Sequence, residues 1–354
     1  MMELKKKWME QGFIDEPFDG TIEELKKSIR RLCEEKQAVV LAHYYTVGDV
    51  QKVADFIGDS LALARQAAKT DAKIIVMCGV HFMAETCKLL SPEKTVLCPD
   101  LNAGCSLADS CKADDLKRFK EEHPGYAVVS YVNTTAAVKA LTDVVVTSGN
   151  ARKIIDAFPQ DAKIIFGPDY NLGSYINSVT GRDMLLWNGG CHVHERFSVE
   201  GIVRMKKQYP EAVVMAHLEC KGPVLALADV KGSTADMLKF AQTSEARQFI
   251  VATEAGILHE LQRTCPEKEF IPVPPETSVE GDDGLKTADD RLQTSDDRLQ
   301  TSDFSCHCNE CQYMKMNSLL KIYNALKYEW PTVEVETQVA EKAVKPIEKM
   351  LEMS

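Results

Sequence analysis

The chain has 354 residues, of which 45% are hydrophobic and 27% charged, a composition typical of a globular protein with two or three domains. A formal net charge of −11 argues against a general nucleic-acid binder. The longest nearly uncharged apolar run, at 74–84, is too short to span a membrane, and residues 1–10 lack the apolar core of a secretion signal. We therefore expect a cytoplasmic protein with neither nucleic-acid nor membrane partners.

The first predicted elements are a helix and a strand. Residues 1–19 have no regular pattern, after which Thr21 and Glu24 form a capping-box pattern that predicts a helix to about Lys36. The apolar run at 38–42 then predicts a buried strand, which ends at His43.

This strand opens a unit that the chain repeats three times. The first strands share an Ala-Val-Val pattern at 38–43, 127–131 and 212–217, and second strands follow at 54–60, 142–148 and 228–234. In each copy a hydroxyl residue stands five positions after an aspartate and seventeen after the end of the first strand, and opens the next helix. Third strands are predicted at 73–77, 163–166 and 248–252, and fourth strands at 95–97, 183–187 and 269–273. A cysteine follows each fourth strand, namely Cys105, Cys191 and Cys311.

The repeat predicts the fold. Short apolar runs that alternate with helical patterns indicate parallel sheets joined by right-handed crossovers. Three copies predict an α/β fold of three similar doubly wound domains with αβα layers, at residues 21–105, 106–191 and 192–311. The helices predicted at 314–326 and 338–353 should pack back on the first domain, so that residues 312–354 complete it.

The third copy contains an insertion. The distance from the end of the first strand to the cysteine is 62 residues in the first copy, 60 in the second and 94 in the third. The excess coincides with a seven-residue tandem repeat at 287–303, within a loop insertion near 280–303. One leucine in seven residues cannot form a coiled-coil seam, so we expect a solvated flexible loop. A neutral expansion is favoured over a regulatory tether.

The repeat also predicts a site. Parallel α/β sheets bind ligands beyond the carboxyl ends of their strands, where helix N-termini offer free N–H groups to anions. The ends of the first strands carry His43, Tyr45, Tyr131, Asn133, His217 and Glu219, and the helix starts carry Ser60, Ser148, Ser233 and Thr234. If the domains face one another around a pseudo-threefold axis, these side chains and the three cysteines converge on one pocket.

Not all histidines carry the same weight. His43 and His217 occupy equivalent positions, which favours a functional role for both. The neighbouring Glu219 and His194 suggest acid–base work there. Structural roles are expected for His81, His123, His259 and His307.

Twelve cysteines in a chain without an export signal favour metal binding or burial over disulfides. Five lie in or beside apolar segments and should be small buried hydrophobes, namely Cys33, Cys78, Cys87, Cys98 and Cys265. The three that recur at equivalent positions form an incomplete thiolate set. A four-iron, four-sulfur cluster held by three cysteines keeps one iron open, and that iron can act as a Lewis acid.

The segment around Cys311 leaves alternatives open. Cys306, Cys308 and Cys311 could bind zinc together with His307. Cys308 could instead form a disulfide with Cys311 under oxidising conditions. Spacing alone does not choose between Cys308 and Cys311 as the third ligand. We favour Cys311 because it adjoins the following helix.

From about residue 36 to 317 the chain resembles the quinolinate synthase family (quinolinate synthetase A), whose members act in bacterial NAD biosynthesis. The matching motifs are AHYY (42–45), GDS (58–60), GVHFMAET (79–86), SPEK (91–94), CS (105–106), YVN (131–133), TSGN (147–150), GPDYNLG (167–173), GCHVH (190–194), HLEC (217–220), GST (232–234), TE (253–254) and CQYMKMN (311–317). Three family prolines are replaced, by Asn188, Leu218 and Gln312, and none of these is a proposed ligand or catalytic residue.

The resemblance implies three α/β domains around a pseudo-threefold axis, each supplying one cluster cysteine. It implies one [4Fe-4S] cluster per chain, held by Cys105, Cys191 and Cys311, with an open iron that binds substrate. The implied reaction condenses iminosuccinate (iminoaspartate) with dihydroxyacetone phosphate to quinolinate and releases phosphate and water.

The resemblance also implies residue roles and partners. Tyr45 and Glu219 are similar to the family's proton-transfer groups, and His43 and His217 to the residues that orient intermediates. Together with His43, His217 and Glu219, the implied substrate binders are Ser60, Tyr131, Asn133, Ser148, Ser233 and Thr234. The implied partners are the iron–sulfur assembly machinery and, in transient contact, an aspartate oxidase or dehydrogenase that supplies iminosuccinate.

Two other functions stay open on the residues alone. An aconitase-like hydro-lyase would use an open iron without a triose phosphate site. A non-catalytic iron–sulfur redox sensor or zinc-stabilised binding protein would need cysteines, but not Tyr131 with Asn133 or His217 with Glu219.

Overall fold

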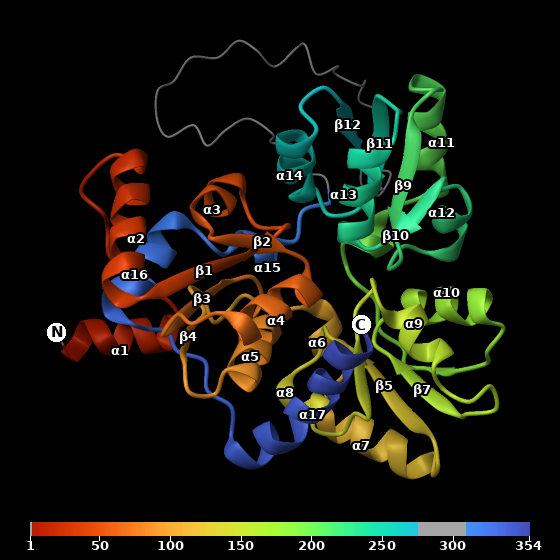
Figure 1. The fold of residues 1–354 in the computed structure, drawn as a ribbon, viewed down its shortest axis with the longest axis horizontal. Coiled ribbons are helices and arrows are strands. Elements are labelled where there is room, and N and C mark those ends of the chain that lie inside the picture. Colours follow the sequence, from red (N-terminus) through yellow and green to blue (C-terminus); the bar gives the residue numbers. More distant parts are fainter. Residues whose placement is uncertain (1, 275–308) are drawn as a thin grey trace.

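The computed structural model describes residues 2–274 and 309–354, which fold into three α/β units around a shared centre (Figure 1). Each unit is built on a four-stranded parallel sheet, with strand orders β2-β1-β3-β4, β6-β5-β7-β8 and β10-β9-β11-β12. The first strand of each unit therefore lies between the second and the third. This confirms the predicted α/β fold of three similar units. The insertion near 280–303, with its tandem repeat at 287–303, lies outside the described residues.

The elements follow the same order in each unit. The first unit comprises α1 (Met2–Gln11), α2 (Ile22–Lys36), β1 (Ala38–His43), α3 (Gly48–Val53), β2 (Phe56–Gly58), α4 (Ser60–Lys69), β3 (Ile74–Cys78), α5 (His81–Leu90), β4 (Thr95–Leu97) and α6 (Ser106–Ser110). The second comprises α7 (Ala113–Glu122), β5 (Ala127–Tyr131), α8 (Ala136–Lys139), β6 (Val144–Val146), α9 (Ala151–Asp156), β7 (Ile164–Gly167), α10 (Tyr170–Thr180) and β8 (Leu185–Leu186).

The third unit and the C-terminal helices complete the chain. The third unit comprises the 3₁₀ helix η1 (His194–Arg196), α11 (Val199–Gln208), β9 (Val213–His217), α12 (Gly222–Ala226), β10 (Val230–Gly232), α13 (Thr234–Thr243), β11 (Gln248–Ala252), α14 (Ile257–Thr264) and β12 (Glu269–Pro272). After it come α15 (Gln312–Lys315), α16 (Leu319–Tyr328) and α17 (Thr337–Met353).

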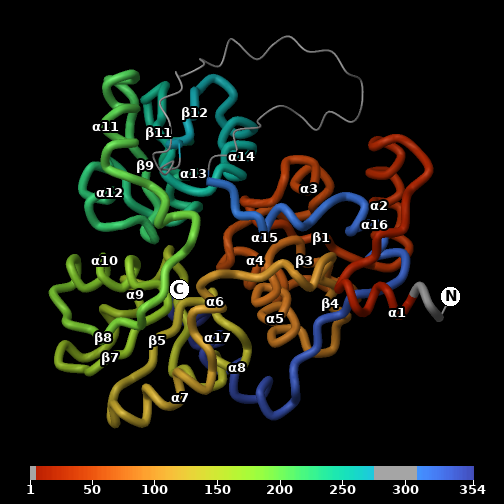
Figure 2. Tube along the Cα trace, turned by 180° about the vertical axis from the view of Figure 1, so that it is seen from behind, coloured from red at the N-terminus to blue at the C-terminus, as the bar shows by residue number. Residues whose placement is uncertain are grey.

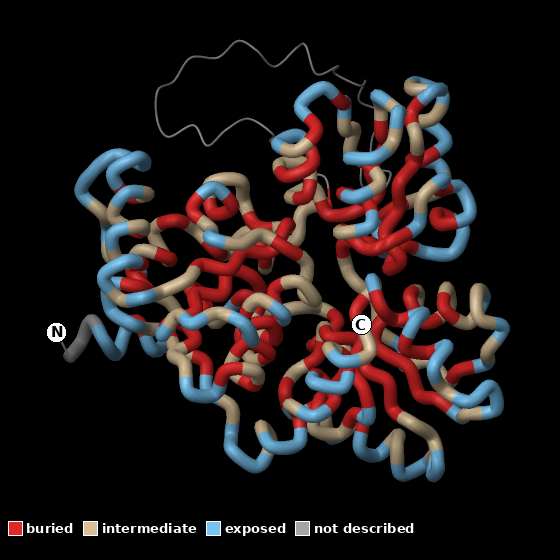
Figure 3. The backbone as a smooth tube through the Cα atoms, in the orientation of Figure 1, coloured by how far each residue is buried: buried red, intermediate tan, exposed pale blue. Residues whose placement is uncertain are grey.

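The core follows from the apolar sequence of the inner strands. The first and third strands of each unit are almost entirely buried (Figure 3). Helices cover both faces of such a parallel sheet, which is why these strands read as continuous apolar runs instead of alternating ones. The polar residues that follow each strand are thereby brought to one edge of the sheet.

The aspartate that precedes each second strand has a structural role. The carboxylates of Asp55, Asp143 and Asp229 each accept a hydrogen bond of 2.7 or 2.8 Å from a first-strand backbone N–H. Each aspartate also donates its own backbone N–H to the carbonyl of that same first-strand residue, at 2.9 Å. At this point the aspartate side chain occupies a backbone N–H that would otherwise bond to the neighbouring strand. Each second strand therefore begins two residues later than predicted, and it also ends two residues earlier.

The C-terminal helices divide between two units (Figures 1 and 2). α16 packs against α2 of the first unit, as expected. α17 packs instead against α8 and β6 of the second unit and against α5 of the first. Its buried face, which includes Ala343, Ile347 and Met350, belongs to the same apolar cluster as residues 144–146. The expectation that the whole segment 312–354 completes the first domain is therefore wrong for α17.

Within residues 2–274 and 309–354, no helix is long and apolar enough to cross a membrane.

Candidate active site

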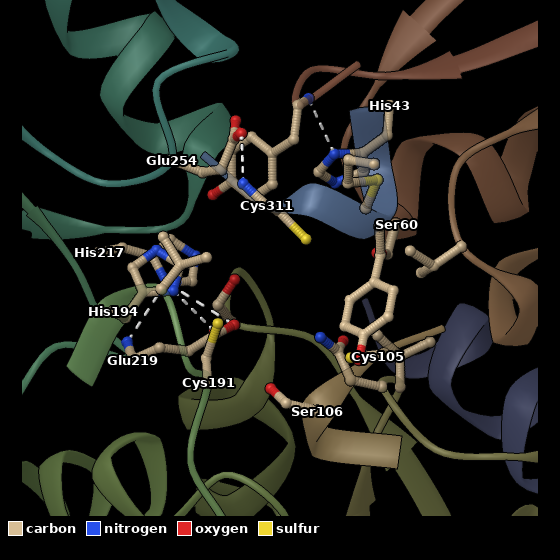
Figure 4. Close-up of a pocket in the computed structure, with 18 of the residues that line it drawn as sticks. His43, Ser60, Cys105, Ser106, Cys191, His194, His217, Glu219, Glu254 and Cys311 are labelled. Carbon is tan, nitrogen blue, oxygen red and sulfur yellow. Dashed lines mark hydrogen bonds and ion pairs between the residues drawn. The ribbon is translucent and has the colours of Figure 1, made fainter. Parts of the chain in front are cut away.

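A pocket opens where the three units meet, and residues that follow their strands converge on it (Figure 4). It encloses about 700 Å³ of empty space, part of which is continuous with solvent. Every site residue predicted from the sequence lines this pocket except Ser233. Each unit contributes four of them: His43, Tyr45, Ser60 and Cys105 from the first, Tyr131, Asn133, Ser148 and Cys191 from the second, and His217, Glu219, Thr234 and Cys311 from the third.

Two histidines have the same local geometry at the ends of β1 and β9. The Nδ1 atom of His43 accepts the backbone N–H of Tyr45 at 3.1 Å, and Nδ1 of His217 accepts that of Glu219 at 3.3 Å. A neutral imidazole whose Nδ1 accepts carries its proton on Nε2, so each ring has an Nε2–H donor. Burial lowers the pKa of His43 to about 3 and that of His217 to about 4, so both rings are neutral near pH 7.

Glu219 is a buried carboxylate with several partners. The Tyr131 hydroxyl donates to Glu219 Oε1 at 2.5 Å, and His194 Nδ1 lies 3.0 Å from Oε2. Burial alone would raise the pKa of Glu219, but the adjacent His194 and the Tyr131 hydroxyl outweigh it and lower this pKa below its usual value. The carboxylate is therefore ionised near neutral pH.

Tyr45 has the opposite proton status. Burial raises its pKa well above the usual value, and the charge of Glu219 adds to this effect, so the phenol keeps its proton. Its hydroxyl lies 2.8 Å from Thr253 Oγ1, which in turn lies 2.9 Å from His194 Nε2. Because His194 also lies beside Glu219, a continuous chain of polar contacts joins Tyr45 to Glu219.

The helix starts differ between units. Asp59 caps α4 and Ser233 caps α13 through their side chains, which leaves Ser60 and Thr234 as the first helical residues, facing the pocket. Ser233 bonds to Asp236, which explains why it does not line the pocket. Ser148 was expected at a helix start, but α9 begins only at Ala151, so Ser148 lies on a loop before it.

Three thiols from three units face this pocket, and none of them is in a disulfide. Burial raises the pKa of Cys105 to about 12 and that of Cys311 to about 11, and it raises that of Cys191 well above its usual value. Thiolates here therefore need a cationic partner, which iron would supply. No fourth cysteine lines the pocket in the described part of the chain. This donor set fits a cluster held by three cysteines.

Two other groups of residues could hold a metal ion in place of the three thiols. Ligand atoms of Cys191, His194 and Glu219 all lie within 4.8 Å of one another and could hold a single ion. In the structure, however, His194 and Glu219 are already engaged with each other, and Glu219 also with Tyr131. The zinc alternative involves Cys306, His307 and Cys308, which lie outside the described residues.

Some residues in and beside the pocket are not among the predicted site residues, which follow the first, second and fourth strands but not the third. Thr253 and Glu254 directly follow β11, a third strand, and therefore reach the same sheet edge. Ser106 and His192 each directly follow a pocket cysteine. The distance from His192 Nδ1 to Ser106 Oγ is 3.1 Å. The position of Thr253 and Glu254 directly after a third strand could have identified them, because parallel strands all end at one edge of the sheet.

The family model described as "Quinolinate synthetase A protein" matches residues 27–352. Quinolinate synthase of Trichodesmium erythraeum is 46% identical over 344 residues, which cover 97% of this chain and 98% of that protein. Quinolinate synthase of Trichormus variabilis is 48% identical over 331 residues, or 94% of each chain. That of Prochlorococcus marinus is 47% identical over 337 residues, or 95% of this chain and 93% of the relative. These matches span all three units and the pocket between them, and the chain belongs to the quinolinate synthetase A protein family.

Proposed function

We propose that this protein is a quinolinate synthase of NAD biosynthesis, which condenses iminosuccinate with dihydroxyacetone phosphate and releases quinolinate, phosphate and water. One observation carries the proposal. A single pocket joins three thiols, one from each unit, to an ionised carboxylate and a protonated phenol that are connected by polar contacts. This combination suits a condensation that also removes water, since both steps move protons.

The pocket is suited to anionic substrates without using a cationic side chain. No lysine or arginine is among its described lining residues. Ser60 and Thr234, the first residues of α4 and α13, offer hydroxyl groups to carboxylate and phosphate oxygens at helix N-termini, where the helix dipole favours negative charge. The Nε2–H groups of His43 and His217 add two neutral donors that can orient the substrates.

Proton transfer is divided between two residues. Glu219, held ionised, removes a proton from the substrate, and Tyr45, held protonated, gives one to a departing oxygen. The contacts through Thr253 and His194 connect these two groups and can return the proton between turnovers.

The proposed cofactor is one [4Fe-4S] cluster held by Cys105, Cys191 and Cys311. When bound, it supplies an open iron that acts as a Lewis acid toward a departing hydroxyl group. We further propose a cytoplasmic location, iminosuccinate supply by an aspartate oxidase or dehydrogenase, and cluster delivery by the iron–sulfur assembly machinery.

The test is anaerobic reconstitution with iron and sulfide, followed by a quinolinate assay. It compares wild type with Cys105→Ser, Cys191→Ser, Cys311→Ser and the matched control Cys308→Ser. The proposal expects the first three variants to lose the four-iron absorption and quinolinate formation, while Cys308→Ser keeps both.

Other outcomes have definite meanings. An inactive Cys308→Ser beside an active Cys311→Ser would replace the third ligand and leave the enzyme. A wild type that binds a cluster and dehydrates another substrate, without making quinolinate, would favour a different hydro-lyase. A wild type that takes up only zinc and forms no quinolinate would overturn the proposal.

A further inference from the structure

The third strands of all three units end in the same register. The last residues of β3, β7 and β11 each pair with the penultimate residue of the first strand in their unit. Two positions after these ends stand Val80, Asp169 and Glu254, which therefore occupy equivalent places. Asp169 and Glu254 are both 0% exposed, although buried carboxylates are rare unless each oxygen has a partner.

The partners of these two carboxylates include the pocket cysteines. Asp169 Oδ2 accepts the backbone N–H of Cys191 at 3.1 Å, and Glu254 Oε1 accepts that of Cys311 at 2.9 Å. The first unit has apolar Val80 at this place, and among the described residues no side chain accepts the N–H of Cys105. A buried carboxylate thus anchors the backbone N–H of two of the three pocket cysteines, and none anchors that of the third.

Glu254 also joins two units. Its Oε1 accepts a second hydrogen bond, from Lys315 Nζ at 2.8 Å, and its Oε2 accepts the N–H of Gly256 at 2.6 Å. Lys315 Nζ also donates to the carbonyl of Tyr45 at 2.8 Å. One ion pair, of buried Glu254 with partly buried Lys315, therefore links the end of β11, the segment that carries Cys311, and the strand end that carries Tyr45.

We propose that Asp169 and Glu254 are positioning residues that hold the Cys191 and Cys311 thiols in place before any metal is bound. The inference rests on the proposed role of these cysteines as ligands. Holding a ligand in advance lowers the ordering cost of metal binding.

The test measures thiol reactivity in the metal-free protein, with no need for activity. Each variant is treated with iodoacetamide, and the alkylation rate of each cysteine is read by peptide mass spectrometry. Glu254→Ala should raise the rate at Cys311 about tenfold, the loss expected for one buried hydrogen bond. Asp169→Ala should do the same at Cys191, and neither should change Cys105. Glu254→Gln, which keeps an acceptor oxygen, should restore most of the protection of Cys311.

Asp100 provides a matched control. It is 2% exposed, accepts the N–H of Asn102 at 2.9 Å and pairs with Lys321 at 2.5 Å, but it contacts none of the pocket cysteines. Asp100→Ala should leave Cys311 reactivity unchanged. Equal effects of Asp100→Ala and Glu254→Ala would overturn the inference, as would no effect of Glu254→Ala. If an alanine variant does not fold, Glu254→Met against Asp100→Leu gives the same comparison, because both changes remove the acceptor oxygens and keep most of the side-chain volume.

Iron retention separates this inference from the proposed function. After reconstitution, Glu254→Ala and Asp169→Ala should lose iron to a chelator several-fold faster than wild type. A wild type that binds no cluster would refute the proposed function, while the alkylation pattern would still decide whether the two carboxylates position the thiols.

Discussion

The ends of β1 and β9 have the same backbone geometry and the same histidine, but the residue two positions later is Tyr45 in one and Glu219 in the other. Burial and a neighbouring carboxylate keep the proton on Tyr45, whereas His194 and Tyr131 keep it off Glu219. The repeated backbone thus fixes where the groups stand, and the side chains around them decide which one keeps its proton and which one loses it.

The largest expected effect comes from replacing Glu219, the proposed base. Glu219→Gln keeps the shape of the side chain but cannot accept a proton, so kcat should fall by about a thousandfold. The measurement is single-turnover quinolinate formation, with iron content as the control for an intact cluster. A loss of less than threefold at full iron content would contradict the assignment of Glu219 as the base.

A smaller loss of activity is expected from replacing Tyr45, the proposed acid. Tyr45→Phe removes the hydroxyl and its contact with Thr253, so kcat should fall by about a hundredfold while KM changes little. Steady-state kinetics of the reconstituted enzyme would show this split. A change confined to KM would instead make Tyr45 a binding residue and end the contrast with Glu219.

The histidine that both strand ends share makes stability depend on pH. The pKa of His43 is about 3 in the folded protein and near 6.5 in the unfolded chain, so the unfolded state binds more protons between these values. Its contribution to stability is complete above pH 6.5 and is lost progressively as the pH falls towards 3. His43→Asn should therefore reduce the drop in thermal midpoint between pH 7 and pH 5 by about 2 °C in metal-free protein. An unchanged drop would mean that His43 does not titrate on unfolding.

The smallest expected effects distinguish Ser233, which caps α13, from its neighbour Thr234, which lines the pocket. Ser233→Ala removes the cap of α13 and should lower stability by about 1 kcal/mol without changing substrate KM. Its neighbour Thr234 faces the pocket, and Thr234→Ala should raise KM and leave stability nearly unchanged. Thermal unfolding and steady-state kinetics on both variants would test this, and matching behaviour would contradict it.

Much of the fold could be predicted because its landmarks repeat. The Ala-Val-Val strands and the aspartates at 55, 143 and 229 report local events, namely a buried strand and a side chain bonded to it. Their positions in all three copies predicted the three sheets. The packing of α17 could not be predicted, since an amphipathic helix shows which face is buried but not which partner covers it.

Most residues of the site could also be predicted from the sequence. Residues at strand ends reach the pocket because topology alone brings them there. Ser148 and Ser233 show the limit, since the point at which a helix begins depends on which side chain caps it. Thr253 connects His194 of its own unit with Tyr45 of the first unit, and a contact between units leaves no mark on spacing within one unit.

The position of α17 also has a consequence for the order in which the chain can fold during synthesis. Residues 144–146 of β6 share an apolar cluster with Ala343, Ile347 and Met350, which are made almost two hundred residues later. Domains generally fold from the N-terminus as the ribosome proceeds. Here the second unit is left without part of its cover until α17 emerges, so the middle of the chain reaches its final packing last.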